Sequence, residues 1–132
     1  MTILILVILQ PHEDGPLFYP TVATISLGSH TLLNFYKKLT DNQPEHHNKK
    51  EFSLLLQPRS LVVLKHDAYT TFMHGIDEVN CDSITDEIAN LNSCDKQMKL
   101  GDSLNRNTRI SLTIRYVPKV LKMKLFNNFN VK

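Results

Sequence analysis

The chain is built from short apolar runs rich in β-branched residues, and turn-forming residues separate one run from the next. Runs of about four to eight such residues are typical of β-strands, whereas an amphipathic helix needs a longer pattern. Six strands are predicted on this basis, at Ile3–Gln10, Thr21–Leu27, Thr31–Tyr36, Glu51–Leu56, Ser60–Lys65 and Arg109–Val117. The sequence therefore predicts an all-β, or β-rich α+β, domain.

Turn signals and two polar segments divide these strands. Gly28-Ser29 and Gln57-Pro58-Arg59 predict tight turns. Segment 37–50 is predicted to be a solvated hairpin loop. Segment 77–108 is predicted to be a long polar loop with one short helix, because three apolar residues stand at helical spacing: Ile84, Ile88 and Leu91. A loop of that length in a compact domain is unusual unless it is functional or disordered.

Length and composition limit the class of protein. With 132 residues, 42% of them hydrophobic and 21% charged, the chain fits one globular domain, 1–132, and lies outside the range of disordered proteins. The net charge of +2 permits contact with a polyanion but does not argue for one. Cys81 and Cys94 show no metal-binding or disulfide spacing. We expect a monomer of the cytoplasm and nucleus. We expect no membrane partner, because the apolar start of the chain is too short to span a bilayer.

A metal site is the first chemical signal. If Pro11-His12-Glu13-Asp14 lies on a strand, His12 and Asp14 point to the same face. A distant histidine would complete a set of two imidazoles and one carboxylate, which suits Fe(II) and leaves positions open. His74 is the best third ligand, because it follows a mainly apolar segment, Ala68–Met73, that we expect to be a strand. The alternative is that both histidines are hydrogen-bonded polar residues near turns, since so short a motif also arises by chance.

In two of the predicted strands, polar and apolar side chains alternate with a period of two. Thr21–Leu27 should turn its apolar set, Ala23, Ile25 and Leu27, toward a core. In the last predicted strand, Arg109 and Arg115 lie on one face, and we expect both to point into the barrel. A buried guanidinium is costly without an anion, and a dicarboxylate could accept two parallel hydrogen bonds from each. The alternative is that the two arginines form ordinary ion pairs at the sheet surface.

The order of these signals, and the sequence around them, resembles the AlkB-like dioxygenases, in particular the branch called AlkB homologue six. The resemblance runs from Pro11 to about Leu121. Five segments carry it: Pro11-His12-Glu13-Asp14-Gly15-Pro16-Leu17-Phe18-Tyr19-Pro20, Thr24-Ile25-Ser26-Leu27-Gly28-Ser29-His30, Gln57-Pro58-Arg59-Ser60-Leu61, His74-Gly75-Ile76, and Arg109-Ile110-Ser111-Leu112-Thr113-Ile114-Arg115. The first of them is far more specific than a tripeptide.

The resemblance implies a double-stranded β-helix, or jelly roll, that binds Fe(II) through His12, Asp14 and His74. It implies that 2-oxoglutarate chelates the iron, that Arg109 meets its far carboxylate, and that Arg115 lies near the other carboxylate. Ser111 stands where several relatives have an asparagine. With O2, such enzymes convert 2-oxoglutarate to succinate and CO2 and hydroxylate a C–H bond of the substrate. The substrate would be a nucleic acid, DNA or RNA, or a protein.

Family members carry a portion before the metal-binding strand, with an Asn-x-Tyr strand and a lid, that Met1–Gln10 does not resemble. We therefore expect the jelly roll to be incomplete on its N-terminal side. Two alternatives stay open beside an active dioxygenase. One is a catalytically silent fragment that binds a metal or nucleic acid, and the other is a non-enzymatic β-sandwich whose histidines coincide by chance.

Overall fold

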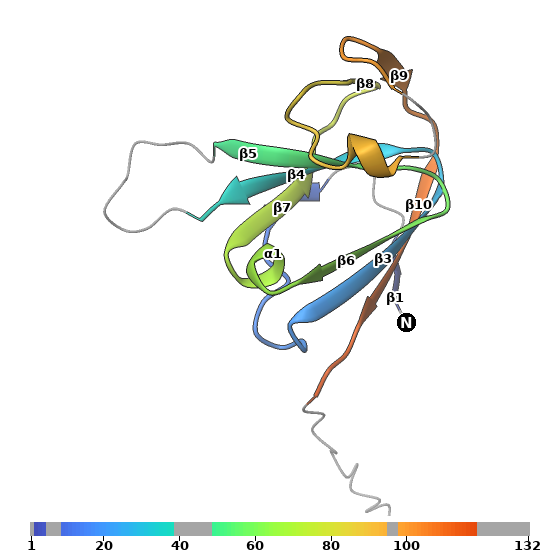
Figure 1. The fold of residues 1–132 in the computed structure, drawn as a ribbon. Coiled ribbons are helices and arrows are strands. Elements are labelled where there is room, and N and C mark those ends of the chain that lie inside the picture. Colours follow the sequence, from blue (N-terminus) through green and yellow to red (C-terminus); the bar gives the residue numbers. More distant parts are fainter. Residues whose placement is uncertain (1, 5–8, 39–48, 95–97, 119–132) are drawn as a thin grey trace, which may run out of the picture.

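The computed structural model describes residues 2–4, 9–38, 49–94 and 98–118 (Figure 1). None of the helices in these residues is long and apolar enough to cross a membrane. Two short helical elements are present, α1 (Asp67–Thr70) and η1 (Leu91–Ser93). The strands are β1 (Thr2–Leu4), β2 (Leu9–His12), β3 (Thr21–Gly28), β4 (Thr31–Lys37), β5 (Lys50–Leu56), β6 (Ser60–Lys65), β7 (Phe72–Ile76), β8 (Cys81–Ser83), β9 (Ser103–Asn105) and β10 (Arg109–Arg115).

Two antiparallel sheets of four strands face one another. One sheet has the order β1-β10-β3-β6, and the other has the order β2-β7-β4-β5. The chain crosses from one sheet to the other between β3 and β4 and again between β5 and β6, and both turns lie on the same side of the molecule (Figure 1). This topology is a double-stranded β-helix, so the predicted all-β jelly roll is confirmed.

Most of the predicted strands are present, with ends that differ by at most two residues. The predicted strand Ile3–Gln10 is wrong, because this stretch holds parts of β1 and β2, which belong to different sheets. Residues 5–8 lie outside the described residues. The segment Ala68–Met73 is also not a strand, because α1 takes up its first part and β7 begins only at Phe72. Local apolarity could not show where the chain changes sheet.

Both predicted turns are found. Gly28 has a φ of +80°, and a Cβ at this position would lie 2.4 Å from the carbonyl oxygen of Thr108. Only glycine combines that backbone conformation with so close an approach. In the other turn Arg59 has a φ of 64°, and its N–H donates to the carbonyl of Ser26. The Gly28 turn thus fixes the start of β10 against the end of β3.

The main core fills the space between the sheets around Leu33, Phe35, Leu56 and Leu64. Aromatic rings strengthen it, since the rings of Phe35 and Phe52 are stacked with their centroids 4.6 Å apart. The expected orientation of β3 is wrong: its most buried residues are Val22 and Ser26, on the face opposite to the apolar set. The inner face of β3 is more polar because it lines the cavity described below.

The outer face of the β10-β3-β6 sheet is apolar and open. Leu61 and Val63 of β6 and Ile110 and Ile114 of β10 are all exposed, between 38% and 61%. The register places Ile25 between Leu61 and Leu112, so that strand β3 continues the same face. The apolar set that was expected inside therefore lies on the outside of this sheet.

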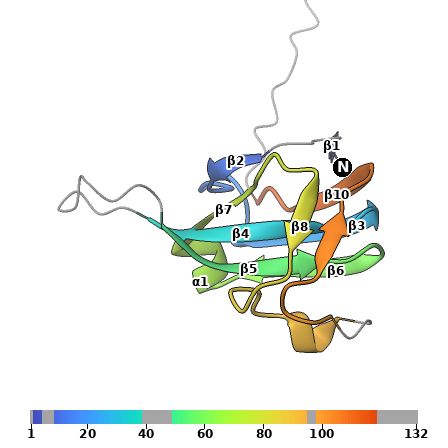
Figure 2. The same ribbon diagram turned by 90° about the horizontal axis from the view of Figure 1, so that it is seen from above.

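Residues 77–94 and 98–108 cover the outer face of the other sheet (Figure 2). The helix predicted around Ile84, Ile88 and Leu91 is wrong, because β8, β9 and the single turn η1 are the regular elements in the described part of this segment. Ile84 and Ile88 are nevertheless buried, packed on Leu55. Within the predicted hairpin loop 37–50, residues 39–48 lie outside the described residues, while the flanking strands β4 and β5 pair antiparallel.

Candidate metal centre

Strands β2 and β7 bring the two predicted histidines together. Their register places His12 directly opposite His74, and the two ring centroids are 4.5 Å apart. Asp14 follows the end of β2, and its Oδ2 lies 3.7 Å from Nε2 of His74. One ligand atom from each of the three residues lies within 4.8 Å of the others. Residues far apart in the sequence thus converge on one point, as a metal ion requires.

Each of the two imidazoles offers a nitrogen that could bind a cation. Nδ1 of His12 lies 2.9 Å from the carbonyl of Gln10, which can only accept a hydrogen bond. Nδ1 therefore carries the proton, and Nε2 is left to bind a cation. Burial lowers the pKa of His74 from 6.5 to about 4, helped by the neighbouring His12 ring, although Asp14 acts in the opposite direction. His74 is therefore neutral at physiological pH, the form that binds metals.

Asp14 is held by a guanidinium and is almost fully buried. Nε and Nη2 of Arg115 each lie 2.6 Å from Oδ1 of Asp14, whose side chain is 3% exposed. This leaves Oδ2 turned toward His74. The guanidinium carbon of Arg115 lies 5.4 Å from the centre of the Phe18 ring. The carboxylate is thereby fixed in one orientation with one oxygen available for a cation.

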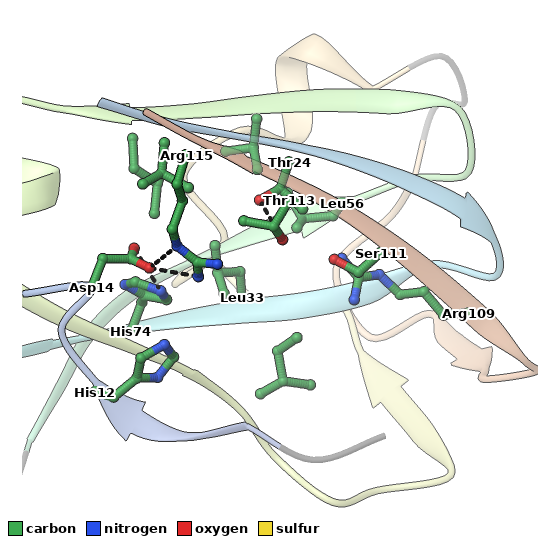
Figure 3. A pocket seen from close by; sticks show the side chains of 14 residues that line it. His12, Asp14, Thr24, Leu33, Leu56, His74, Arg109, Ser111, Thr113 and Arg115 are labelled. Carbon is green, nitrogen blue, oxygen red and sulfur yellow. Dashed lines mark hydrogen bonds and ion pairs between the residues drawn. The ribbon is translucent and has the colours of Figure 1, made fainter. Parts of the chain in front are cut away.

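A cavity of about 110 Å³ extends from this centre between the two sheets (Figure 3). His12, Asp14 and His74 lie at one end, and Arg109 and Ser111 lie at the other (Figure 3). The inward face of β10 supplies one wall through Arg109, Ser111, Thr113 and Arg115, and apolar side chains supply much of the rest: Val22, Leu33, Leu56, Val62, Leu64 and Ile76. A molecule with polar ends and a short apolar middle matches this lining.

Arg109 is the cationic end of the cavity. It lies opposite Gly28 in the register, and its Nη2 donates to Oγ of Ser26 at 2.9 Å. Its Nε is buried and has no hydrogen-bond partner among the described residues. Burial, and secondarily Arg106, lower the pKa of Arg109. A buried guanidinium in this state favours an anion as its partner.

The donor set fits a particular class of metal and co-substrate. Two imidazoles and one carboxylate on one side of a cation form the ligand set of non-haem Fe(II) oxygenases, with open positions for other ligands. The partly buried Arg109 at the far end of the cavity fits a carboxylate. The residues present are thus compatible with an iron ion and a dicarboxylate in the same cavity.

Some contributors to the site were not predicted. Thr24 and Thr113 line the middle of the cavity with their hydroxyl oxygens 3.3 Å apart. The hydroxyl of Tyr69 donates to the carbonyl of Gly15 at 2.7 Å and holds the loop after Asp14. The threonine pair could have been found only from the register of β3 with β10. No sequence signal indicates the contact of Tyr69, because it joins residues 54 positions apart.

Comparison with known proteins places these residues in a family context. No protein-family model matches the chain. A zebrafish (Danio rerio) protein called probable RNA/DNA demethylase ALKBH6 is 45% identical over 122 residues, which are 89% of this chain and 51% of the relative. An uncharacterized protein of Acanthamoeba polyphaga mimivirus is 36% identical over 112 residues, which are 84% of this chain and 43% of the relative. The chain thus spans about half the length of these relatives.

Proposed function

This chain belongs to the AlkB-like family, and we propose on that basis that it forms the catalytic domain of an Fe(II)- and 2-oxoglutarate-dependent dioxygenase. The observation that carries the proposal is the convergence of His12, Asp14 and His74 within 4.8 Å at one end of a cavity whose other end holds Arg109. A β-sandwich with unrelated histidines has no reason to combine these two features. We further propose that residues 1–132 act as a single domain and a monomer.

In this proposal His12, Asp14 and His74 hold the iron. Bound Fe(II) would supply the activation of O2, with one oxygen atom entering the succinate formed from 2-oxoglutarate and the other entering a C–H bond of the substrate. Arg109, assisted by Ser111, holds the far carboxylate of 2-oxoglutarate and so orients the molecule along the cavity. Arg115 keeps Asp14 in place and lies near the other carboxylate. The apolar walls limit the access of water.

We propose a nucleic acid as the substrate class. The support is the name of the zebrafish relative, probable RNA/DNA demethylase ALKBH6. Oxidation of an N-methyl group would give a hydroxymethyl product that releases formaldehyde and leaves the base unmethylated. Action on a nucleic acid agrees with the cytoplasmic and nuclear location that we propose. A protein substrate is the alternative that the assay below also covers.

The test separates metal binding from turnover. Mn(II) binding is measured by calorimetry, and Fe(II)-dependent formation of succinate from 2-oxoglutarate is measured on the same protein. We expect both activities, and we expect His12→Ala to remove both. His66→Asn is the matched control, because His66 is exposed and its φ of 53° is one that asparagine tolerates. Methylated oligonucleotides and peptides are then compared as substrates through formaldehyde release.

Two results would decide against the proposal. Absence of Mn(II) binding would exclude the metal centre altogether. Mn(II) binding that His12→Ala removes, combined with no succinate formation, would favour a metal-binding module without turnover. That second function is kept because the chain spans only about half of its relatives.

A further inference from the structure

Of the three candidate metal ligands, Asp14 is the one whose backbone no strand holds. His12 and His74 are paired residues of β2 and β7. β2 ends at His12 and β3 begins at Thr21, so Asp14 lies in the connection that crosses from one sheet to the other. Arg115 fixes the carboxylate, but the position of a side chain also depends on the backbone that carries it. The contacts of the residues around Asp14 therefore decide how well this ligand is placed.

The helical turn α1 holds the residue that follows Asp14. The hydroxyl of Tyr69, the third residue of α1, donates to the carbonyl of Gly15 at 2.7 Å. No atom lies within 4 Å of a Cβ added to Gly15, so the side of the chain where a side chain would lie is open at this point. The hydrogen bond from Tyr69 therefore restrains a stretch of backbone that side-chain packing leaves open on that side.

A second and weaker tie connects α1 with the residue before Asp14. Nζ of Lys38 lies 2.8 Å from a carboxylate oxygen of Glu13 and donates to the carbonyl of Thr70, the last residue of α1. The side chains of Lys38 and Glu13 are 31% and 44% exposed, so water and salt weaken this ion pair. The contact of Tyr69 is partly buried, where a hydrogen bond is stronger. Tyr69 is therefore the more effective of the two ties.

The turn α1 is itself fixed between the two sheets. It connects β6 of one sheet with β7 of the other, and Ala68 packs against the main core. The N–H groups of Tyr69 and Thr70 both donate to the carbonyl of His66 at 2.9 Å, which closes the turn. β7, the strand of His74, begins two residues after the end of α1. The same turn thus leads into the strand of one candidate ligand and holds the backbone next to another.

We propose that Tyr69 is a positioning residue of the metal centre, which sets the affinity for the cation by holding the backbone of Asp14 through Gly15. The inference rests on the proposed function for the presence of the metal. Tyr69 is not among the residues that line the cavity, so it acts through the chain and not on the cation or co-substrate. Without its hydroxyl, Asp14 would sample more orientations, and the loss of this freedom on metal binding would lower the affinity.

Tyr69→Phe tests the proposal, because it removes the hydroxyl and keeps the ring. Calorimetric titration with MnCl2 should show an affinity about fivefold weaker than that of the unchanged protein. The Fe(II) concentration that gives half-maximal succinate formation should rise by the same factor. The KM for 2-oxoglutarate at saturating Fe(II) should stay unchanged, because Arg109 keeps its place. A residue that only stabilises the fold would not separate these two constants.

Tyr36→Phe is the matched control. The hydroxyl of Tyr36 donates to Oδ1 of Asp77 at 3.3 Å, and Tyr36 does not line the cavity either. Each variant thus loses one hydroxyl contact with a distant part of the chain, but only Tyr69→Phe loses a contact next to a candidate ligand. Tyr36→Phe should therefore leave the Mn(II) affinity within about twofold of the unchanged protein, whatever it does to the melting temperature.

A measurement on the metal-free protein separates this inference from the proposed function. The heteronuclear 1H–15N NOE of the Asp14 and Gly15 amides should fall in Tyr69→Phe and stay at the native value in Tyr36→Phe. If the unchanged protein bound no Mn(II), the proposed function would fail, and the NOE values would still show whether Tyr69 holds this backbone. Mn(II) affinity that Tyr69→Phe leaves unchanged, or NOE values that it leaves unchanged, would overturn the positioning role.

Discussion

Arg115 donates from two nitrogens to a single oxygen of Asp14, with Nε and Nη2 each 2.6 Å from Oδ1. The two residues are 101 positions apart in the sequence. Arg115 is the last residue of β10, and Asp14 follows β2, which belongs to the other sheet. The pair therefore ties the β10-β3 sheet to the metal-binding end of β2. It also supplies the positive charge that a buried carboxylate needs when no cation is bound.

The first prediction concerns this pair. Arg115→Met should lower the free energy of unfolding of the metal-free protein by about 1–3 kcal/mol, less than for a fully buried pair because Arg115 is 30% exposed. Saturating Mn(II) should reduce this loss, because the cation then provides the positive charge beside Asp14. Urea unfolding with and without Mn(II) measures both quantities.

Lys65→Met serves as the control for Arg115→Met. Lys65 is an exposed cation at the end of β6, and its replacement should cost about 0.5 kcal/mol or less in either condition. An Arg115→Met deficit of the same size with and without Mn(II) would show that Arg115 does not act through the charge of Asp14.

The second prediction is a pH dependence of stability. The pKa of His74 is about 4 in the folded protein and 6.5 in the unfolded chain, so the unfolded state binds the proton more tightly. The metal-free protein should keep the full contribution of neutral His74 above pH 6.5 and lose it progressively down to about pH 4. The loss from this group amounts to at most roughly 3 kcal/mol.

Thermal melting between pH 4 and pH 7.5 checks the pH prediction against His74→Gln. Carboxylates titrate in both proteins, so the difference between the two curves isolates the imidazole. Mn(II) should make the dependence of the native protein steeper, because the metal binds only the neutral form. Parallel curves for the two proteins would contradict the assigned shift.

Part of this architecture could be read from the sequence, for identifiable reasons. The strands of the jelly roll carry their own local pattern, and Arg109 and Arg115 fall on one face of β10 because side chains alternate. His12 and Asp14 were expected on one face of a strand for the same reason, but β2 ends at His12, and Asp14 reaches His74 from the segment that follows the strand. A period of two fixes which residues share a face, whatever the partner strands are.

The pattern does not say which of two faces lies inside. Ile25 lies on the outer side of β3, because the inner side carries the small and polar residues that line the cavity. The assignment of a face from apolarity fails where a functional cavity replaces the core. Ile84 and Ile88 have helical spacing, yet they pack on Leu55 from an irregular segment. Their burial depends on the sheet beneath them, which local sequence does not contain.

The third prediction concerns an ion pair that no sequence pattern indicated. Asp82 is 3% exposed and accepts two hydrogen bonds from Arg106, which also donates to the carbonyl of Asp77 at 2.7 Å. Arg106→Met should cost about 3–5 kcal/mol, because it leaves a buried carboxylate without its guanidinium. The double variant Asp82→Leu with Arg106→Met should recover most of that loss.

An exposed ion pair provides the comparison for Asp82 and Arg106. Nζ of Lys50 lies 2.6 Å from a carboxylate oxygen of Glu87, and both side chains are at least one third exposed. Lys50→Met should cost no more than about 1 kcal/mol. Urea denaturation of the unchanged protein, Asp82→Leu, Arg106→Met and the double variant gives the coupling energy. A double variant as unstable as Arg106→Met alone would mean that the loss of packing, rather than the unpaired carboxylate, determines the cost.

The fourth prediction compares two glycines that differ in the space available for an added Cβ. Gly28 and Gly101 both have a positive φ, +80° and +91°, so alanine should cost about 1 kcal/mol at either position for the backbone alone. At Gly101 no atom lies within 4 Å of an added Cβ, whereas at Gly28 the oxygen of Thr108 lies at 2.4 Å. Gly28→Ala must therefore also displace the backbone before β10, and its total cost should be about 3 kcal/mol or more.

The displacement in Gly28→Ala should reach the cavity as well. Thr108 is the neighbour of Arg109, and the N–H of Ser29 donates to the same Thr108 oxygen at 3.1 Å. Moving this segment shifts the guanidinium away from Ser26, so the affinity for 2-oxoglutarate should fall in Gly28→Ala and stay unchanged in Gly101→Ala. Thermal unfolding and calorimetric titration of 2-oxoglutarate in the presence of Mn(II) measure the two effects. Equal behaviour of the two variants would show that the contact with Thr108 places no constraint on the start of β10.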